Sequence, residues 1–272
     1  MKSIKEATAK LTHRTKKSDD NDNMSALAGK VALITGGSKG IGAALSERLA
    51  SLGATVAINY SSDSSAADKL VEKIKKNGHG QATTVKANAA SIPEIESMVD
   101  QVVKQHGKID ILVPCAGVLP MRTLDKTSEK DFDDTFALNV KGPYFLAQKA
   151  VPHMTSGGRI VFFSTSLTAV SQVAPGYLLY NATKGAIEQV TRVLSKDLAA
   201  KGINVNCVAP GPTATELFLK GKSDEMIKAI GSTNPHGRIG EPDEVADAVT
   251  LLTGEQSRWV TGQVLRINGG MA

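Results

Sequence analysis

Tyr180 and Lys184 are the residues whose types and spacing best suit proton transfer in this sequence. They lie four positions apart near the start of a predicted helix, so their side chains project from one face. A tyrosine of ordinary pKa, about 10, is a poor acid or base near neutral pH. An ammonium about 4 Å from the phenolate contributes about 4 kcal/mol at an effective dielectric constant of about 20, which lowers that pKa by at most about three. The spacing thus predicts an acid/base pair; the alternative is a partly buried tyrosine beside a surface lysine.

The segment 35–42, Thr-Gly-Gly-Ser-Lys-Gly-Ile-Gly, has the composition of an anion-binding turn. It follows a predicted buried strand directly and opens a predicted helix. Glycines at 36, 40 and 42 let the backbone approach a pyrophosphate, and a helix N-terminus directs free N–H groups and the positive end of its dipole at it. The same glycines also occur in strand-to-helix turns that bind nothing. Their position in the first strand–helix unit favours a nucleotide site.

Strands and helices alternate from Lys30 onward, and no linker or repeat interrupts residues 30–270. Strands that are apolar on both faces and joined by helices predict a parallel sheet covered on both sides, with right-handed crossovers. We therefore expect a three-layer, doubly wound α/β fold, Rossmann-like, with about seven strands in a single domain at 25–272. The expected strands are 31–34, 55–59, 82–87, 109–113, 159–163, 203–208 and 264–267. After the helix that follows the glycine turn, helices are expected at 65–77, 93–106, from 128 through 139, 177–200 and 243–253.

The composition, 41% hydrophobic and 22% charged, is typical of a soluble globular protein. Cys115 and Cys207 lie in apolar stretches, where two buried thiols of a reducing compartment are expected rather than a disulfide framework. No apolar run reaches the length of about 18 residues that spans a bilayer. No His/Cys/Asp cluster suggests a metal. The net charge of +5 is partly carried by the tail, so no nucleic-acid partner is expected.

Residues 1–24 are expected to form a disordered polar tail. The tail lacks the apolar core of a secretory signal, so a cytoplasmic location is expected. A mitochondrial presequence is the alternative, because the first 17 residues contain one acidic residue, Glu6.

The GxxxGxG spacing at 36–42, combined with Tyr180 and Lys184, resembles the short-chain dehydrogenase/reductase family over residues 30–270. Similar sequences include acyl-carrier-protein ketoreductases and fungal or plant carbonyl reductases. The resemblance implies an oxidoreductase acting on CH–OH groups, which interconverts a carbonyl and an alcohol by hydride transfer. Tyr180 would be its general acid/base and Lys184 would tune the tyrosine.

The resemblance also implies two further catalytic residues. A serine is expected 12 to 15 positions before the tyrosine, just after the fifth strand, to hold the substrate oxygen. Ser166 is our choice there and Thr165 the alternative. Asn139 matches a helix asparagine whose main chain holds a water in a proton relay to the lysine; a merely polar or capping asparagine is the alternative.

NADP(H) is the expected cofactor. An NAD-type site places an acid at the end of the second strand, where this chain has Tyr60, Ser61 and Ser62, although Asp63 follows. In the family, a basic residue at the place of Lys39 indicates NADP. The expected cofactor-binding residues are Gly36, Ser38, Lys39, Gly40, Ile41, Gly42, Tyr60, Ser61, Ser62, Asn88, Ala89, Ala116, Gly117, Tyr180, Lys184, Pro210, Gly211, Thr213 and Thr215.

The chain departs from the family pattern at two strand ends. Pro114-Cys115-Ala116-Gly117 stands where Asn-Asn-Ala-Gly is common, so two amides are missing. Asn88 follows the third strand where an aspartate is frequent, and its side-chain oxygen is expected to meet the adenine amino group.

The substrate is expected to be a small carbonyl or alcohol. Residues 213–238 are expected to form a mobile flap whose Leu217, Phe218, Leu219, Met226 and Ile230 either face the ligand or pack the flap down. By resemblance, a homotetramer or dimer is expected through helices around 128–153 and 177–200. Two other functions stay open, an NAD-dependent alcohol dehydrogenase and a non-catalytic NADP(H)-binding regulator. Intact Tyr180, Lys184, Ser166 and Asn139 argue against the regulator.

Overall fold

One parallel sheet organises the computed structural model, which describes residues 26–78 and 80–272; the predicted tail at 1–24 lies outside them. The strand order is β3-β2-β1-β4-β5-β6-β7, with every neighbouring pair parallel. The predicted doubly wound fold is confirmed, and the strand ends differ from expectation by at most two residues. The strands are β1 (Val31–Thr35), β2 (Thr55–Tyr60), β3 (Gln81–Lys86), β4 (Ile111–Pro114), β5 (Arg159–Phe163), β6 (Asn204–Pro210) and β7 (Val264–Ile267).

The helices begin and end at residues suited to those places. Asp63 caps the helix at 64–77 by accepting a hydrogen bond from the Ala66 N–H, and Gly78 ends it in the left-handed conformation at φ +75°. The helices are α2 (Gly40–Ser51), α3 (Ser64–Asn77), α4 (Ile92–His106), α5 (Glu129–Phe136), α6 (Gly142–Ala150), α7 (Leu178–Asp197), α8 (Glu216–Leu219), α9 (Asp224–Ser232) and α10 (Pro242–Leu251).

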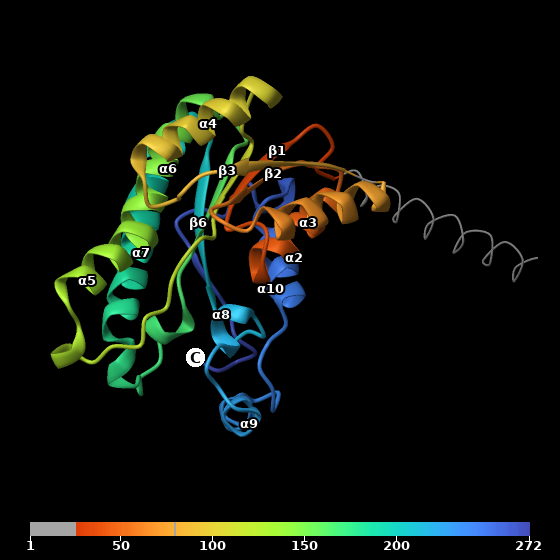
Figure 1. Ribbon diagram of the computed structural model, residues 1–272. Helices are drawn as coiled ribbons and strands as arrows, with labels where there is room; N and C mark the ends of the chain where they lie inside the picture. Colours follow the sequence, from red (N-terminus) through yellow and green to blue (C-terminus); the bar gives the residue numbers. More distant parts are fainter. Residues whose placement is uncertain (1–25, 79) are drawn as a thin grey trace, which may run out of the picture.

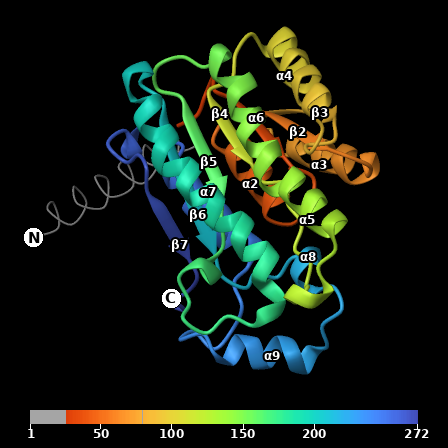
Figure 2. The same ribbon diagram turned by 90° about the vertical axis from the view of Figure 1, so that its left-hand side faces the viewer.

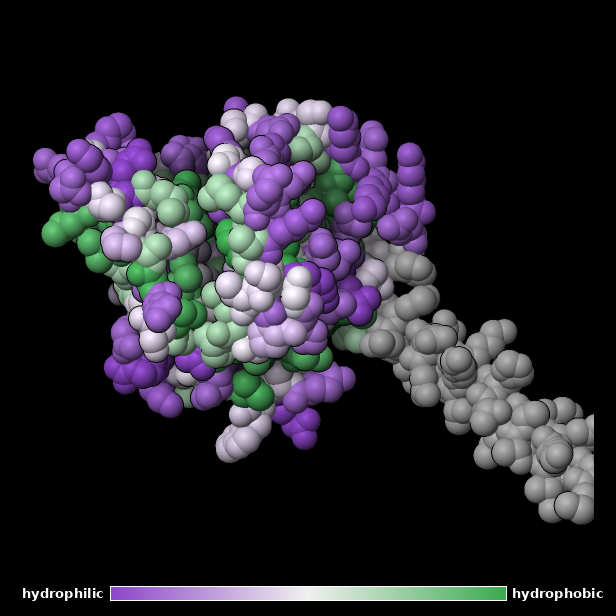
Figure 3. Space-filling view, turned by 90° about the horizontal axis from the view of Figure 1, so that it is seen from below, coloured by the Kyte–Doolittle hydropathy of each residue, from purple (hydrophilic) through white to green (hydrophobic). Residues whose placement is uncertain are grey.

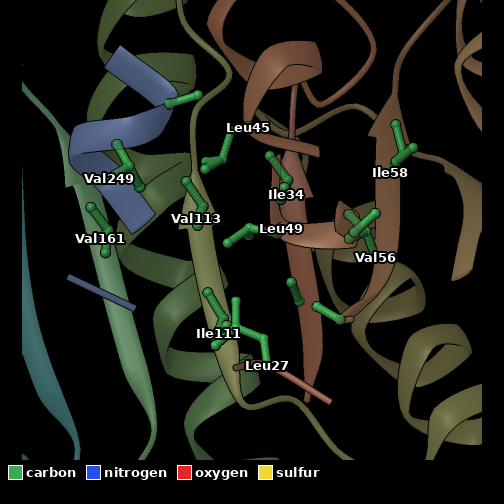
Figure 4. Packing of buried hydrophobic residues seen from close by; sticks show 14 of the residues in the cluster. Leu27, Ile34, Leu45, Leu49, Val56, Ile58, Ile111, Val113, Val161 and Val249 are labelled. Atoms are coloured by element: carbon green, nitrogen blue, oxygen red, sulfur yellow. The ribbon is translucent and has the colours of Figure 1, made fainter. Parts of the chain in front are cut away.

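Two layers of helices cover the sheet (Figure 1). Helices α2, α3 and α10 bury their apolar sides on one face, and α4, α6 and α7 on the other. On the first face, Leu45 and Leu49 of α2 lie against Ile34 of β1 and Val113 of β4 (Figure 4). Central strands such as β1 are buried along their whole length, as a sheet with two covered faces requires.

The long helix expected from residue 128 through 139 is divided. A π-helical turn at 137–141 joins α5 to α6, and the buried Asn139 lies within it. Such turns are rare and frequently occur at functional sites. Asn139 is 1% exposed, so its side chain lies in the interior of the protein.

The segment expected to be a flap folds as α8 and α9 beyond the carboxyl ends of the strands (Figure 2). Thr215 caps α8 and Ser223 caps α9 through their hydroxyls. A bridge between Thr213 and Gly240 closes the segment at its base. Its mobility stays a prediction. Across residues 26–78 and 80–272, no helix is long and apolar enough to cross a bilayer.

Candidate active site

A cavity of about 590 Å³ lies at the carboxyl ends of the strands. The chain moves from β1 outward to β3 and then returns to build β4 to β7 on the other side, so a crevice forms outside β1 and β4. Loops following β1, β4, β5 and β6 line the cavity, together with α7 and the flap. On the face of the molecule that carries this end of the sheet, hydrophobic side chains reach the surface between hydrophilic edges (Figure 3).

The glycine turn forms one end of the cavity and fits a phosphate group. A Cβ on Gly36 would lie 3.0 Å from the Ala116 Cα, and a Cβ on Gly42 would lie 2.2 Å from the Gly36 carbonyl oxygen. Within the described chain, no side chain caps the N-terminus of α2, where Lys39 is the N-cap residue. The free N–H groups and the dipole of this helix end are the donors that bind a pyrophosphate.

Asn59 supports the glycine turn and was not singled out in the sequence. Its side-chain oxygen accepts a hydrogen bond from the Gly36 N–H at 3.4 Å, and its amide donates to the Val85 and Ala87 carbonyl oxygens. It is buried at the end of β2 and so couples three strand ends. A polar residue at the last inward position of an otherwise apolar strand was the signal available in the sequence.

Lys39 is paired with carboxylates beside the glycine turn. Its Nζ lies 2.8 Å from Asp63 Oδ2 and 3.7 Å from Glu216 Oε2. The hydrogen bond with Asp63 raises the pKa of Lys39, and the same bond lowers the pKa of Asp63. Lys39 therefore stays charged and lies between the end of β2 and the flap.

Thirteen of the expected cofactor residues line the cavity, and six do not. Those in the wall are Gly36, Lys39, Gly40, Ile41, Gly42, Ala116, Gly117, Tyr180, Lys184, Pro210, Gly211, Thr213 and Thr215. Those outside it are Ser38, Tyr60, Ser61, Ser62, Asn88 and Ala89. The Asn88 side-chain oxygen, expected at the adenine, accepts a hydrogen bond from the Ala90 N–H of its own turn at 3.0 Å.

Tyr180 and Lys184 lie one turn apart on α7 and both line the cavity. The Lys184 Nζ lies 5.6 Å from the centroid of the Tyr180 ring and donates a hydrogen bond to the Phe163 carbonyl oxygen at 2.8 Å. The sequence predicted that Lys184 lowers the pKa of Tyr180, and this prediction is wrong for the arrangement in the structure. Burial raises the pKa of Tyr180 to about 12, opposed by a hydrogen bond with Thr165, and burial lowers the pKa of Lys184. The free-energy cost of forming a buried phenolate is larger than the stabilisation that the Lys184 ammonium gives it, because that ammonium points at the Phe163 carbonyl oxygen.

The two candidate hydroxyls after β5 point in different directions. Ser166 is almost fully buried, and its hydroxyl donates to the Ala209 carbonyl oxygen at 2.8 Å. The Thr165 side chain lies close enough to the phenol to lower the pKa of Tyr180, in opposition to burial. Both residues line the cavity, but the geometry favours Thr165, our alternative, over Ser166 as the hydroxyl beside the phenol.

Asn139 links the loop after β4 to α7 through its side chain. Its amide donates to the Val118 carbonyl oxygen at 2.9 Å and to Thr183 Oγ1 at 3.1 Å, while its oxygen accepts from the Val118 N–H at 2.9 Å. A Cβ on Gly117 would lie 3.3 Å from that oxygen. The side chain of Asn139 thus holds the backbone at Val118 next to α7.

Cys115 differs from its expected burial. It is partly exposed and lines the cavity, whereas Cys207 is buried as expected. Apolar surroundings raise the pKa of Cys115 to about 12. It is therefore a neutral thiol with little nucleophilic character.

The remaining wall of the cavity is mostly apolar. From the flap it includes Leu217, Phe218 and Ile230, whereas Leu219 and Met226 do not line it. Five further apolar or aromatic residues, which the sequence did not single out, are Val118, Leu119, Leu167, Tyr177 and Met271. Met271 is next to the last residue, and only the path of the chain after β7 brings it here. Within residues 26–78 and 80–272, no group of His, Cys, Asp and Glu could hold a metal ion.

The sheet order and the glycine turn place this protein in the class of doubly wound α/β nucleotide-binding folds. The family model described as "Enoyl-(Acyl carrier protein) reductase" matches residues 36–272. An Arabidopsis thaliana protein named "NADPH-dependent aldehyde reductase-like protein, chloroplastic" is 38% identical, over 90% of this chain and 94% of its own. The chain belongs to the short-chain dehydrogenase/reductase family, whose members are oxidoreductases.

Two solved structures are similar to this chain along nearly their whole length. A dehydrogenase/reductase from Sinorhizobium meliloti 1021 superposes with a TM-score of 0.87 at 37% identity, covering 92% of this chain and 97% of that one. A short-chain dehydrogenase from Burkholderia cenocepacia J2315, solved in complex with NADP, gives a TM-score of 0.85 at 36% identity. It covers 90% of this chain and 99% of its own.

Proposed function

We propose that the protein is an NADP(H)-dependent reductase of apolar ketones or aldehydes, which also catalyses the reverse oxidation. One observation carries the proposal. A phenol, a hydroxyl and a lysine, from Tyr180, Thr165 and Lys184, meet in the wall of the cavity whose other end is the phosphate-binding turn. The NADPH named for the Arabidopsis relative and the NADP bound to the Burkholderia structure support the choice of cofactor.

Each catalytic group of the chain has a distinct task in this proposal. The cofactor supplies a hydride to the carbonyl carbon when bound. Tyr180 donates its proton to the carbonyl oxygen, and the hydroxyl of Thr165 holds that oxygen in place. Because burial raises the pKa of Tyr180 to about 12, the phenol is protonated near neutral pH, which is the form that reduction needs. Lys184 and the main chain of Asn139 would return a proton to the phenol.

Consumption of NADPH and NADH with a panel of carbonyl compounds tests the proposal. The panel should run from small charged keto acids to bicyclic aromatic ketones. We expect turnover with NADPH and the large uncharged ketones, because the substrate wall is apolar. Turnover with NADH alone would favour the NAD-dependent dehydrogenase instead. Tight NADPH binding without turnover of any carbonyl would favour the regulator.

Replacing Thr165 and Ser166 one at a time should show which of the two hydroxyls holds the substrate oxygen. Thr165→Val keeps the branched shape, removes the hydroxyl, and is expected to lower kcat/KM by about 100-fold, the typical effect of losing one donor to the reacting oxygen. Ser166→Ala leaves the buried Ala209 carbonyl without its donor. It should reduce the free energy of unfolding by about 1–3 kcal/mol while kcat changes by less than about threefold. Steady-state kinetics and urea unfolding check both variants, and the opposite pattern would restore Ser166.

Removing the charge of Asp63 should strengthen binding of a 2′-phosphate. Asp63 Oδ2 lies 2.8 Å from the Lys39 Nζ. A 2′-phosphate bound to Lys39 would therefore lie next to the negative charge of Asp63, which repels it. Asp63→Asn keeps an oxygen for the Ala66 cap. Because both side chains are partly exposed, we expect 2′,5′-ADP to bind about three- to fivefold more tightly and 5′-AMP unchanged.

Isothermal calorimetry of the two nucleotides at low and high salt measures this difference. Asp68→Asn, an exposed position on the same helix, is the control for a general change in charge. Weaker binding of 2′,5′-ADP by Asp63→Asn would contradict this prediction. It would mean that Asp63 holds Lys39 in position for the phosphate and does not compete with the phosphate for Lys39.

The homodimer or homotetramer and the cytoplasmic location also stay proposals. Exposed apolar side chains on the helices expected at the interface support the assembly. These are Phe132, Tyr144, Leu178 and Val193.

A further inference from the structure

Glu188 contacts the turn after β5 at both of its ends. Glu188 lies on α7, four positions after Lys184. Its Oε1 lies 2.7 Å from Ser164 Oγ and 2.6 Å from Thr168 Oγ1. Thr165, the hydroxyl beside Tyr180, lies between these two contacts in the sequence.

The two contacts have the length of strong hydrogen bonds. Distances of 2.5–2.7 Å are typical of a hydroxyl that donates to a carboxylate. Both hydroxyls donate to Glu188 Oε1, and Thr168 shares its single proton between Glu188 and the Thr165 carbonyl oxygen. Thr168 Oγ1 also lies 2.8 Å from the Thr165 carbonyl oxygen, and Ser164 Oγ lies 3.4 Å from the Lys184 carbonyl oxygen. One carboxylate thus links both ends of the turn to the helix that carries the catalytic pair.

The interior of the turn is held by neutral contacts on its other side. On that side Ser166 donates to Ala209 of β6, and within the turn itself Thr165 accepts a weak bond from the Leu167 N–H at 3.4 Å. The position of the turn relative to α7 therefore depends on the two contacts with Glu188. Directly before the turn, Lys184 of α7 donates to the Phe163 carbonyl oxygen at 2.8 Å. Among the described residues, the other hydrogen bonds between the turn and α7 are the 3.4 Å contacts of Ser164 with the Lys184 carbonyl oxygen and of Asn181 with the Leu167 carbonyl oxygen.

We propose that Glu188 is a positioning residue, which sets the distance between the Thr165 hydroxyl and Tyr180 by linking Ser164 and Thr168 to α7. The inference rests on the proposed function, because it assigns Glu188 a role in the same reaction. Glu188 does not touch the substrate; it acts through the turn. Release of the turn lets the Thr165 hydroxyl move away from the phenol, and a displacement of about 1 Å at a reacting centre costs about 100-fold in rate.

Two substitutions and one control test this role. Glu188→Leu removes the acceptor at similar size, and Glu188→Gln keeps one side-chain oxygen that accepts both hydroxyls. Glu72→Gln, an exposed residue of α3, controls for the loss of one negative charge. We expect Glu188→Leu to lower kcat by about 10- to 100-fold with the Kd of NADPH within about twofold of the parent. Glu188→Gln should recover kcat to within about fivefold of the parent.

A readout independent of turnover separates this inference from the proposed function. Amide hydrogen exchange of the peptide covering residues 164–168 should quicken in Glu188→Leu and stay unchanged in Glu72→Gln. If the parent reduces no carbonyl, the proposed function fails, while faster exchange still shows that Glu188 holds the turn. If exchange and kcat of folded Glu188→Leu both match the parent, or if NADPH binding falls as much as kcat, the positioning role is overturned.

Discussion

Tyr180→Phe is expected to lower kcat for carbonyl reduction by about 1,000-fold, within the 10²–10⁴ that a positioned general acid contributes. The phenylalanine ring keeps the packing of this partly buried side chain and removes only the proton donor. Loss of that donor leaves the developing alkoxide without a proton. The free energy of unfolding should change little, because the hydroxyl faces the cavity.

Stopped-flow measurement of NADPH oxidation, with the cofactor Kd determined separately, checks this prediction. Tyr144→Phe removes the same hydroxyl from an exposed tyrosine of α6 and is the matched control. We expect the Kd of NADPH to stay within about threefold in both variants, because only the reacting centre changes. A Tyr180→Phe enzyme as fast as the parent would show that another group supplies the proton.

Gly42→Ala is expected to abolish useful cofactor binding. A Cβ at this position lies 2.2 Å from the Gly36 carbonyl oxygen and 3.0 Å from the Gly37 Cα, so the turn itself has to move. The turn holds the N–H groups directed at the phosphates, and a shift of about 1 Å there should weaken NADPH binding by about 100-fold or more. Overpacking should also reduce the free energy of unfolding by about 1–3 kcal/mol.

Calorimetric titration with NADPH and urea unfolding measure the two effects. Gly185→Ala on α7 is the control, since a Cβ there meets no atom within 4 Å. That control should gain about 0.5–1 kcal/mol in the free energy of unfolding, because alanine is the better helix former. Normal NADPH affinity in Gly42→Ala would place the phosphates away from this turn.

The fold followed from local patterns in the chain. Short β-branched strands, helices between them and glycines at the turns predicted the seven strands, because strand and helix periodicities are properties of adjacent residues. The glycine turn at 36–42 and the shared helix face of Tyr180 and Lys184 could be predicted from the sequence for the same reason. Turn glycines and an i, i+4 pair depend on the local backbone alone.

The chemistry of the cavity depended on contacts between distant segments. Ser166 donates to Ala209 of β6, and Glu188 of α7 contacts Ser164 and Thr168 on either side of Thr165, so residues far away in the sequence hold this turn. The local sequence pattern did not predict the burial that raises the pKa of Tyr180. It also did not predict that the chain after β7 brings Met271 into the wall of the cavity. The sequence alone determined the architecture and the helix that carries Tyr180 and Lys184 on one face, because both are encoded in neighbouring residues. The direction of each hydroxyl and the protonation of the phenol were decided by tertiary structure, because side-chain direction and solvation depend on what packs against them from elsewhere in the chain.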